Sequence, residues 1–229
     1  DQLDATAQLD PDDNSKIIWE DLPYVCQLVV EGQAPVQYYS VNEAIAAAPT
    51  TGVQVRIEML VEEYSVTEEI TIGEGRNILL TTAASLTTED KTAKLIRSVD
   101  TSAQTAYTGD LIYLSGTNTQ ITLGNIVLDG NKAAVTWDNP VKGSLVRADL
   151  AGQINLGVQG QANEMPTLQN NKTSDKLQTA PAVFAYKTAL NMYGGTVQDN
   201  EMQNSSDHAY TGAILVESAI LTMAAGLIP

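Results

Sequence analysis

Apolar and polar positions follow one pattern four times in the second half of the chain. Each copy has an apolar strand, a short polar gap and a second apolar strand that runs towards Gly or Asn. The copies are LIYLSGTNTQITLGNIVLDGN from Leu111, SLVRADLAGQINLGVQGQAN from Ser144, AVFAYKTALNMYGGTVQDN from Ala182 and AILVESAILTMAAGLI from Ala213. Strand-sized repeats at an interval of about 30 to 40 residues predict stacked units that bury their apolar sides against each other.

The four copies can be aligned residue by residue. Equivalent first strands are expected to begin at Leu111, Leu145, Val183 and Ile214, and equivalent second strands at Ile121, Ile154, Leu190 and Leu221. Asn131 and Asn200 align after their second strands, where Asn tolerates a left-handed turn. The most variable part is the loop from Ala162 to Pro181, and variable loops on one side of a constant stack are frequent binding surfaces.

The first half of the chain starts with polar, acidic residues and two apolar runs between residues 17 and 39. Ser40-Val41-Asn42-Glu43 is a capping box that predicts a short helix, which Pro49 ends. Such a helix could close the exposed end of a stack. After Gly52, apolar and polar residues alternate, which predicts short strands separated by a polar loop at residues 84–94.

Charge narrows the range of partners. The chain has 28 acidic and 12 basic residues, a net charge of −16. Nucleic-acid binders carry a basic surface, and anionic membranes attract basic segments, so neither partner is expected. No stretch is long enough to span a bilayer, so no membrane insertion by this segment is expected. Self-repulsion of this size favours a soluble monomer.

Cysteine and histidine are too scarce for thiol chemistry. The single Cys26 lies in an apolar run and is expected to be a small buried hydrophobe. A catalytic thiol would need a histidine partner, and the one histidine, His208, lies far away in a polar segment.

The stretch from Cys26 to Ala84 resembles the start of pectate-lyase-like right-handed parallel β-helix domains, in particular those on surface proteins of Gram-positive gut bacteria. The matching residues are Tyr39, Ser40, Ala44, Ile45, Tyr64, Gly75, Asn77, Ile78 and Leu80. The later copies, with GGTVQDN and TGAILVES, look like coils common in that family, so the resemblance covers residues 26 to 229. This fold carries lyases, hydrolases, adhesins and phage tail proteins alike, so it does not name an activity.

The expected fold class is therefore all-β: a single-stranded right-handed parallel β-helix (solenoid) with a short N-terminal capping helix. Residues 1–37 would form an acidic leader and N-terminal strands, and residues 38–229 the β-helix. The chain stops at Pro229 within what looks like a strand, so we expect the β-helix to be truncated there.

No convergent catalytic set is apparent in the sequence. Glycosidases need two carboxyl groups across the scissile bond, and the one Asp-Asp pair, Asp12-Asp13, lies outside the repeats. Arg147 is the only basic residue of the repeats that falls on a predicted strand, beside Asp149, and such pairs are often plain surface ion pairs. A catalytic role is assigned to no residue.

Calcium is the only cofactor that the sequence brings into question, and none is expected to be required. Asp10, Asp12 and Asn14 resemble the opening of an EF-hand loop, but Ser15 replaces its glycine and Asp21 its bidentate glutamate. Asp129, Asp199, Asp207 and Glu217 could line one face if the copies stack in register, but solvated turn carboxylates are the favoured interpretation of these residues.

Tyrosines suggest the surface that binds. The chain has 9 tyrosines and 1 phenylalanine, and tyrosines on a stacked face can pack against sugar rings. The candidate binding residues are Tyr113, Tyr186, Tyr193, Asp199 and Asn200. The function predicted is a non-enzymatic extracellular module, a cell-surface adhesin or stalk of a Gram-positive bacterium that recognises a glycan or a host surface protein. The alternatives are a polysaccharide lyase or glycoside hydrolase acting on an acidic polysaccharide, and a purely structural spacer or phage-fibre segment.

Overall fold

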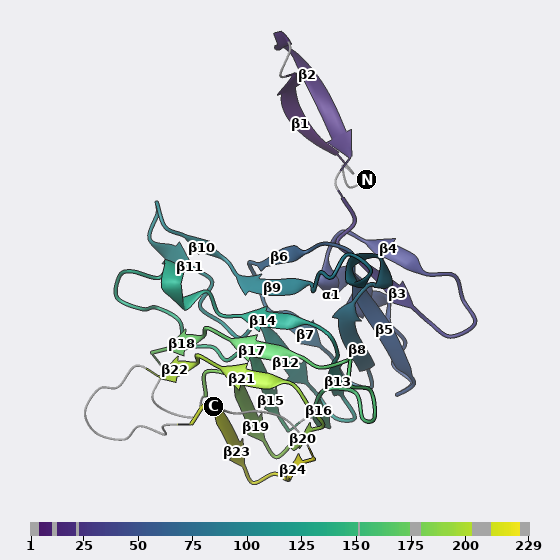
Figure 1. Ribbon diagram of the computed structural model, residues 1–229, viewed down its shortest axis with the longest axis vertical. Helices are drawn as coiled ribbons and strands as arrows, with labels where there is room; N and C mark the ends of the chain where they lie inside the picture. The colour runs from purple at the N-terminus through teal and green to yellow at the C-terminus, as the bar shows by residue number, and fades with distance from the viewer. Residues whose placement is uncertain are drawn as a thin grey trace.

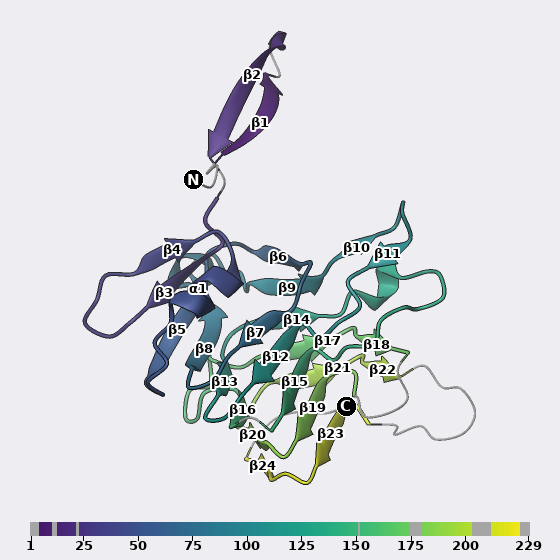
Figure 2. The ribbon, with the colours of Figure 1, turned by 180° about the vertical axis from the view of Figure 1, so that it is seen from behind.

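The computed structural model describes residues 5–10, 13–21, 23–150, 152–174, 180–202 and 212–224, and only the backbone of residues 5–21. Near the N-terminus, β1 (Ala5–Asp10) and β2 (Asp13–Asp21) pair antiparallel as a hairpin. Figures 1 and 2 show this hairpin standing away from all other strands. The body of the protein therefore begins with β3.

The predicted fold class, a single-stranded right-handed parallel β-helix (solenoid), is wrong. The described strands are divided among separate sheets: two five-stranded parallel sheets, one eight-stranded mixed sheet and three two-stranded sheets. In the mixed sheet, β3 (Cys26–Val29) pairs antiparallel with both β4 (Val36–Tyr38) and β5 (Gln54–Met59). The prediction assigned all of residues 38–229 to one solenoid, whereas β5 of this range pairs antiparallel with β3 of the preceding segment, in a mixed sheet that is separate from the two parallel ones.

Three sheets enclose the core, and we name each by one of its strands. The β12 sheet contains β7 (Ile70–Ile72), β12 (Ile112–Ser115), β15 (Val146–Asp149), β19 (Val183–Tyr186) and β23 (Ile214–Glu217). The β13 sheet adds β8 (Asn77–Thr82), β13 (Gln120–Leu123), β16 (Gln153–Leu156), β20 (Ala189–Met192) and β24 (Leu221–Met223) to β3, β4 and β5. The β14 sheet contains β6 (Glu63–Val66), β9 (Lys94–Arg97), β14 (Val127–Asp129), β17 (Thr167–Gln169) and β21 (Thr196–Gln198).

The copies of the sequence pattern pair with one another in parallel and in register. Ile121, Ile154, Leu190 and Leu221 form one continuous column of partners in the β13 sheet, as the alignment predicts. In the β12 sheet the column is Ile112, Val146, Val183 and Ile214. The predicted starts at Leu111 and Leu145 are therefore one residue early. Both leucines are fully buried just before their strands, which is why they read as strand residues.

The loop predicted from Ala162 to Pro181 contains two strands that the sequence analysis missed, β17 and β18 (Lys172–Thr173). Leu168 of β17 is fully buried and pairs with Leu128 and Val197 of the neighbouring strands. Each complete copy therefore supplies a third strand, in the β14 sheet. A strand of three residues with one apolar side chain gives too weak a pattern to be read from sequence.

The predicted N-terminal helix is confirmed as α1 (Val41–Ala47). The hydroxyl of Ser40 accepts the Glu43 N–H at 3.1 Å, and Val41, Ala44 and Ile45 are buried against the core. The polar loop at residues 84–94 begins with a short helix, α2 (Ala84–Thr87), which was not predicted. The predicted burial of Cys26 is confirmed, and burial raises the pKa of its thiol to about 12, which leaves it protonated and unreactive at neutral pH.

Small elements complete the described chain: the hairpin of β10 (Val99–Asp100) and β11 (Thr105–Ala106), the strand β22 (Glu201–Met202), which pairs with β18, and the 3-10 turn η1 (Lys132–Ala134). Among the described residues, no helix has the length and apolar character needed to cross a bilayer.

Candidate functional site

The outward side chains of the β12 sheet combine aromatic, acidic and basic groups on one surface. Ile112 and Leu114 of β12 are buried, so the alternate residues Tyr113 and Ser115 belong to the other face of the strand. One row across that face consists of Tyr113, Arg147, Phe184 and Leu215, and a second of Ser115, Asp149, Tyr186 and Glu217. In-register parallel pairing therefore places aromatic, acidic and basic side chains next to each other.

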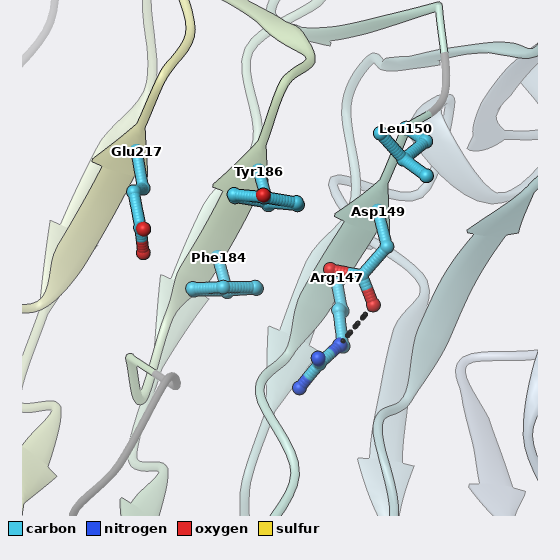
Figure 3. A pocket seen from close by; sticks show the side chains of 6 residues that line it. All are labelled: Arg147, Asp149, Leu150, Phe184, Tyr186 and Glu217. Carbon is cyan, nitrogen blue, oxygen red and sulfur yellow. Dashed lines mark hydrogen bonds and ion pairs between the residues drawn. The ribbon is translucent and has the colours of Figure 1, made fainter.

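A shallow hollow of about 310 Å³ opens on this surface, and we call it the Tyr186 hollow. It is lined by Arg147, Asp149, Leu150, Phe184, Tyr186 and Glu217. Figure 3 shows the rings of Phe184 and Tyr186 roughly parallel on β19, with Arg147 and Asp149 on one side and Glu217 on the other. The volume lies at the lower end of the range of about 300–1,000 Å³ that small-molecule sites occupy.

Arg147 organises one wall of the hollow. Its Nε lies 2.8 Å from Oδ2 of Asp149, and its guanidinium carbon lies 4.7 Å from the centre of the Phe184 ring. Burial opposes ionisation, but the hydrogen bond and the charge of Asp149 outweigh it and raise the pKa of Arg147 above its ordinary value. Arg147 is therefore a permanent cation that covers Phe184, which is 2 % exposed, so Tyr186 is the aromatic side chain with accessible surface.

The strands of this sheet end in a shared backbone conformation that shapes the rim of the hollow. The residues directly after β12, β15, β19 and β23 all have positive φ: Gly116 at 94°, Leu150 at 59°, Lys187 at 51° and Ser218 at 53°. This turn brings Leu150 to the rim, where it is 57 % exposed, and places Nζ of Lys187 5.0 Å from the centre of the Tyr186 ring.

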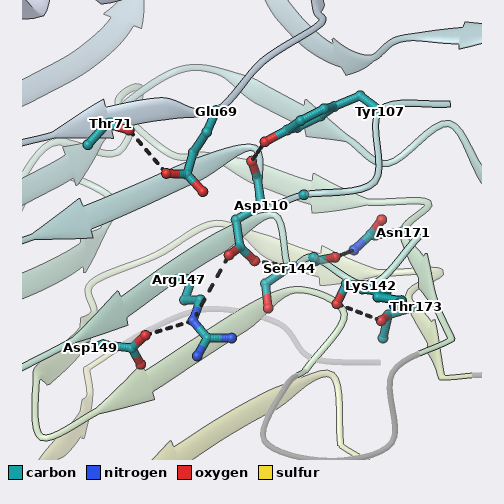
Figure 4. A network of polar contacts seen from close by, with 12 residues as sticks. Glu69, Thr71, Tyr107, Asp110, Lys142, Ser144, Arg147, Asp149, Asn171 and Thr173 are labelled. Atoms are coloured by element: carbon teal, nitrogen blue, oxygen red, sulfur yellow. Dashed lines mark hydrogen bonds and ion pairs between the residues drawn. The ribbon is translucent and has the colours of Figure 1, made fainter. Parts of the chain in front are cut away.

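Behind this wall lies a network of buried polar groups around Asp110 (Figure 4). One carboxylate oxygen of Asp110 accepts the backbone N–H of Ser144 at 2.6 Å, and the other lies 4.0 Å from Nε of Arg147. The backbone carbonyl of Asp110 accepts the hydroxyl of Tyr107 at 2.9 Å. Burial raises the pKa of Asp110 to about 6, although the Ser144 N–H and the charge of Arg147 act in the opposite direction.

Arg97 is the innermost member of this network and is fully buried at the end of β9. Its Nη1 donates to the carbonyls of Tyr107 at 2.9 Å and Gly109 at 2.6 Å, and its Nη2 to the side-chain oxygen of Asn171 at 3.3 Å. Its Nε has no hydrogen-bond partner among the described residues. Burial lowers the pKa of Arg97 to about 10, so it remains charged at neutral pH.

Two of the five predicted binding residues lie on this face. Tyr186 lines the hollow, and Tyr113 is two strands away in the row of Arg147. The other three lie elsewhere: Tyr193 follows β20 of the β13 sheet, while Asp199 and Asn200 follow β21 of the β14 sheet. The prediction treated the stack as offering one tyrosine-bearing face, whereas these residues belong to strands of three different sheets.

Asn200 has a structural role. Its side-chain oxygen accepts the backbone N–H of Asn171 at 3.0 Å, and its amide donates to the carbonyls of Leu168 and Gln198 at 2.9 and 2.8 Å. The left-handed geometry expected at Asn131 is confirmed by a φ of 54°, whereas at the aligned Asn200 it is the preceding residue, Asp199, that has a positive φ, of 55°. The side chain of Asn200 thus holds the turn that follows β21.

The weak metal candidates are only partly covered by the described residues. Asp12 and Asp207 lie outside the described residues, and Asp10 and Asn14 are described only by their backbone in the hairpin. Asp129 is buried and accepts hydrogen bonds from the side chains of Gln169 and Asn170 on the β14 sheet, whereas Glu217 belongs to the β12 sheet. Within the described part of the chain, no group of three His, Cys, Asp or Glu side chains could hold a metal ion.

Phe184, Leu150 and Asp110 were not anticipated as neighbours of the site. Phe184 and Tyr186 are two residues apart on one strand, so their side chains belong to the same face, and this spacing is visible in the sequence. Asp110 precedes its strand and approaches Arg147 only because β12 and β15 are paired. No sequence signal marks it.

Comparison with known proteins adds no relative from which a function could be transferred: no protein family, curated protein or solved structure matches the chain. The resemblance to pectate-lyase-like domains over residues 26–229 therefore stays a prediction from sequence, and the function has to be argued from the β12 sheet itself.

Proposed function

We propose that this protein is a non-enzymatic, extracellular binding module of a cell surface, and that it recognises a glycan in the Tyr186 hollow. The observation that carries the proposal is the combination of an accessible tyrosine ring with carboxylates of Asp149 and Glu217 on the two neighbouring strands. A sugar ring can pack its C–H face on an aromatic ring while its hydroxyls bond to carboxylates at the edges.

The charges of the hollow favour a neutral sugar. Arg147 is already paired with Asp149 at 2.8 Å. At the rim, the ammonium of Lys187 lies 5.0 Å from the centre of the Tyr186 ring and offsets the charge of Glu217, so these two cations and two carboxylates leave the hollow close to neutral. The whole chain carries a net charge of −16 and repels polyanions. With about 310 Å³, the hollow has room for one sugar residue rather than for a long chain segment.

A glycan array followed by calorimetry tests the proposal. Tyr186→Ala should weaken binding of the best neutral glycan about five- to twentyfold, because the stacking surface is lost. Tyr24→Ala is the matched control, because Tyr24 is 42 % exposed and belongs to the N-terminal end of the body, where it stacks on Tyr39. Circular dichroism confirms that both variants are folded.

The same experiments separate the alternatives. The proposal is contradicted if the folded protein binds no glycan on the array, or if Tyr186→Ala leaves glycan binding unchanged. Capture of a host surface protein, with no glycan bound, would show that the ligand is a protein and not a glycan. Incubation with polygalacturonate, with and without calcium, tests the alternative that the protein is an enzyme. Unsaturated uronides would favour a lyase, and new reducing ends a lyase or a hydrolase.

A further inference from the structure

We propose that Asp110, which does not line the Tyr186 hollow, is a positioning residue that shares Arg147 with Asp149 and thereby controls how freely Asp149 can accept hydrogen bonds from a ligand. This inference rests on the proposed function only for its effect on binding. Its structural part concerns three side chains whose contacts are described.

The geometry places one cation between two carboxylates. Nε of Arg147 lies 2.8 Å from Oδ2 of Asp149 and 4.0 Å from Oδ2 of Asp110. Figure 4 shows both interactions converging on the same nitrogen from opposite sides. Asp149 lies in the wall of the hollow, whereas Asp110 lies behind it and is fixed by the Ser144 N–H at 2.6 Å. A change in the charge of Asp110 therefore reaches the hollow through Arg147.

The charge of Asp110 is balanced by several neighbours. Positive groups face it from two strands, Arg147 on β15 and Arg97 on β9, and the carboxylate of Glu69, just before β7, opposes them. The phenol of Tyr107 contacts its backbone, and burial together with nearby carboxylates raises the pKa of that phenol to about 12, so it stays neutral. Around Arg147 the further titratable groups are Asp149 and Tyr113. Burial raises the pKa of Asp110 to about 6, so Asp110 changes charge in the mildly acidic range.

The two protonation states have different consequences for Asp149. When Asp110 is ionised, it competes for Arg147, and the oxygens of Asp149 are freer to accept hydroxyls. When Asp110 is protonated, it no longer competes for Arg147, and the carboxylate of Asp149 is more fully occupied by that cation. Binding should therefore be tighter above pH 6 than below pH 5, by about two- to tenfold, the range that one hydrogen bond covers.

An NMR titration without ligand tests the structural part. The side-chain Nε–Hε resonance of Arg147 should shift with an inflection near pH 6 that matches the titration of the Asp110 carboxyl carbon, and this inflection should vanish in Asp110→Asn. An Arg147 resonance that does not follow Asp110 overturns the proposal, whether or not any glycan binds.

Calorimetry between pH 4.5 and 7.5, with the neutral glycan that gives the strongest array signal, tests the effect on binding. Wild-type affinity should rise with pH, and Asp110→Asn should show a flat profile near the low-pH value. An Asp110→Asn profile parallel to wild type overturns the inference. If no array glycan binds while the Arg147 inflection is present, the proposed function fails and the positioning by Asp110 stands.

Discussion

Nη2 of Arg97 lies 3.3 Å from the side-chain oxygen of Asn171, and both residues are fully buried. Asn171 in turn donates its amide to the carbonyls of Gly143 at 3.0 Å and Pro181 at 2.6 Å. A charge in the core thus joins the segment after β9 to the segments before β15 and β19. Buried polar networks of this kind stabilise one arrangement of the chain only while every partner is present.

Arg97→Met should destabilise the protein by about 3–5 kcal/mol, because the carbonyls of Tyr107 and Gly109 and the side-chain oxygen of Asn171 lose their donor. Arg56→Met is the control. The Arg56 side chain is 44 % exposed and pairs with Glu58 at 3.1 Å, so its loss should change the free energy of unfolding by about 0–1 kcal/mol. Urea denaturation measures both, and equal losses would refute the structural role given to Arg97.

Asp110→Asn should reduce the pH dependence of stability. The pKa of Asp110 rises from 3.8 to about 6 on folding, so the folded state binds its proton more tightly. The resulting stability is fully present below about pH 4 and is lost as the pH rises through 6. The fall in unfolding free energy between pH 4 and 7 should therefore be smaller in the variant, by about 1–3 kcal/mol.

Denaturation at four pH values measures this difference. Glu31→Gln is the control, because Glu31 is an exposed carboxylate. Curves for Asp110→Asn and wild type that run parallel across the range would show that Asp110 does not contribute.

Leu150→Asn should stabilise the protein by about 0.5–1 kcal/mol. Leucine pays a steric penalty of about 1–2 kcal/mol at a φ of 59°, a region that asparagine tolerates, and little burial is lost at 57 % exposure. Thermal denaturation is the measurement. A lower melting temperature would indicate that Leu150 packs more than its exposure suggests.

Leu168→Ala tests the strand that was not anticipated. The side chain is fully buried between Leu128 and Val197, so its truncation should lower the free energy of unfolding by about 2–5 kcal/mol. Val53→Ala, at a residue that is 57 % exposed, should change it by less than about 0.5 kcal/mol. A small effect at Leu168 would argue that β17 is not part of the core.

The sequence predicts those parts of the fold that depend on local pattern. The helix after Ser40 follows from its cap, and the column from Ile121 to Leu221 follows from the repeat, because in-register pairing aligns equivalent apolar residues. The antiparallel pairing of β3 and the division into separate sheets depend on where turns send the chain, and the repeat carries no such information.

The candidate site was predicted only in part for a related reason. Tyr186 was identified because a tyrosine on a strand is visible in the sequence. Arg97 was missed because it occupies an inward position after Leu95, where alternation predicts an apolar residue. Its partners lie up to 74 residues away, so only the folded chain shows that the charge is compensated.

The columns of the core differ between their two ends. In the β13 sheet, Ile121, Ile154 and Leu190 are fully buried, whereas Leu221 and Met223 of β24 are 46 % and 51 % exposed. Fewer packed neighbours mean a smaller free energy of local opening. Amide protons of β23 and β24 should therefore exchange with deuterium long before those of β12 and β13, and loss of structure on heating should begin at these two strands and spread towards α1.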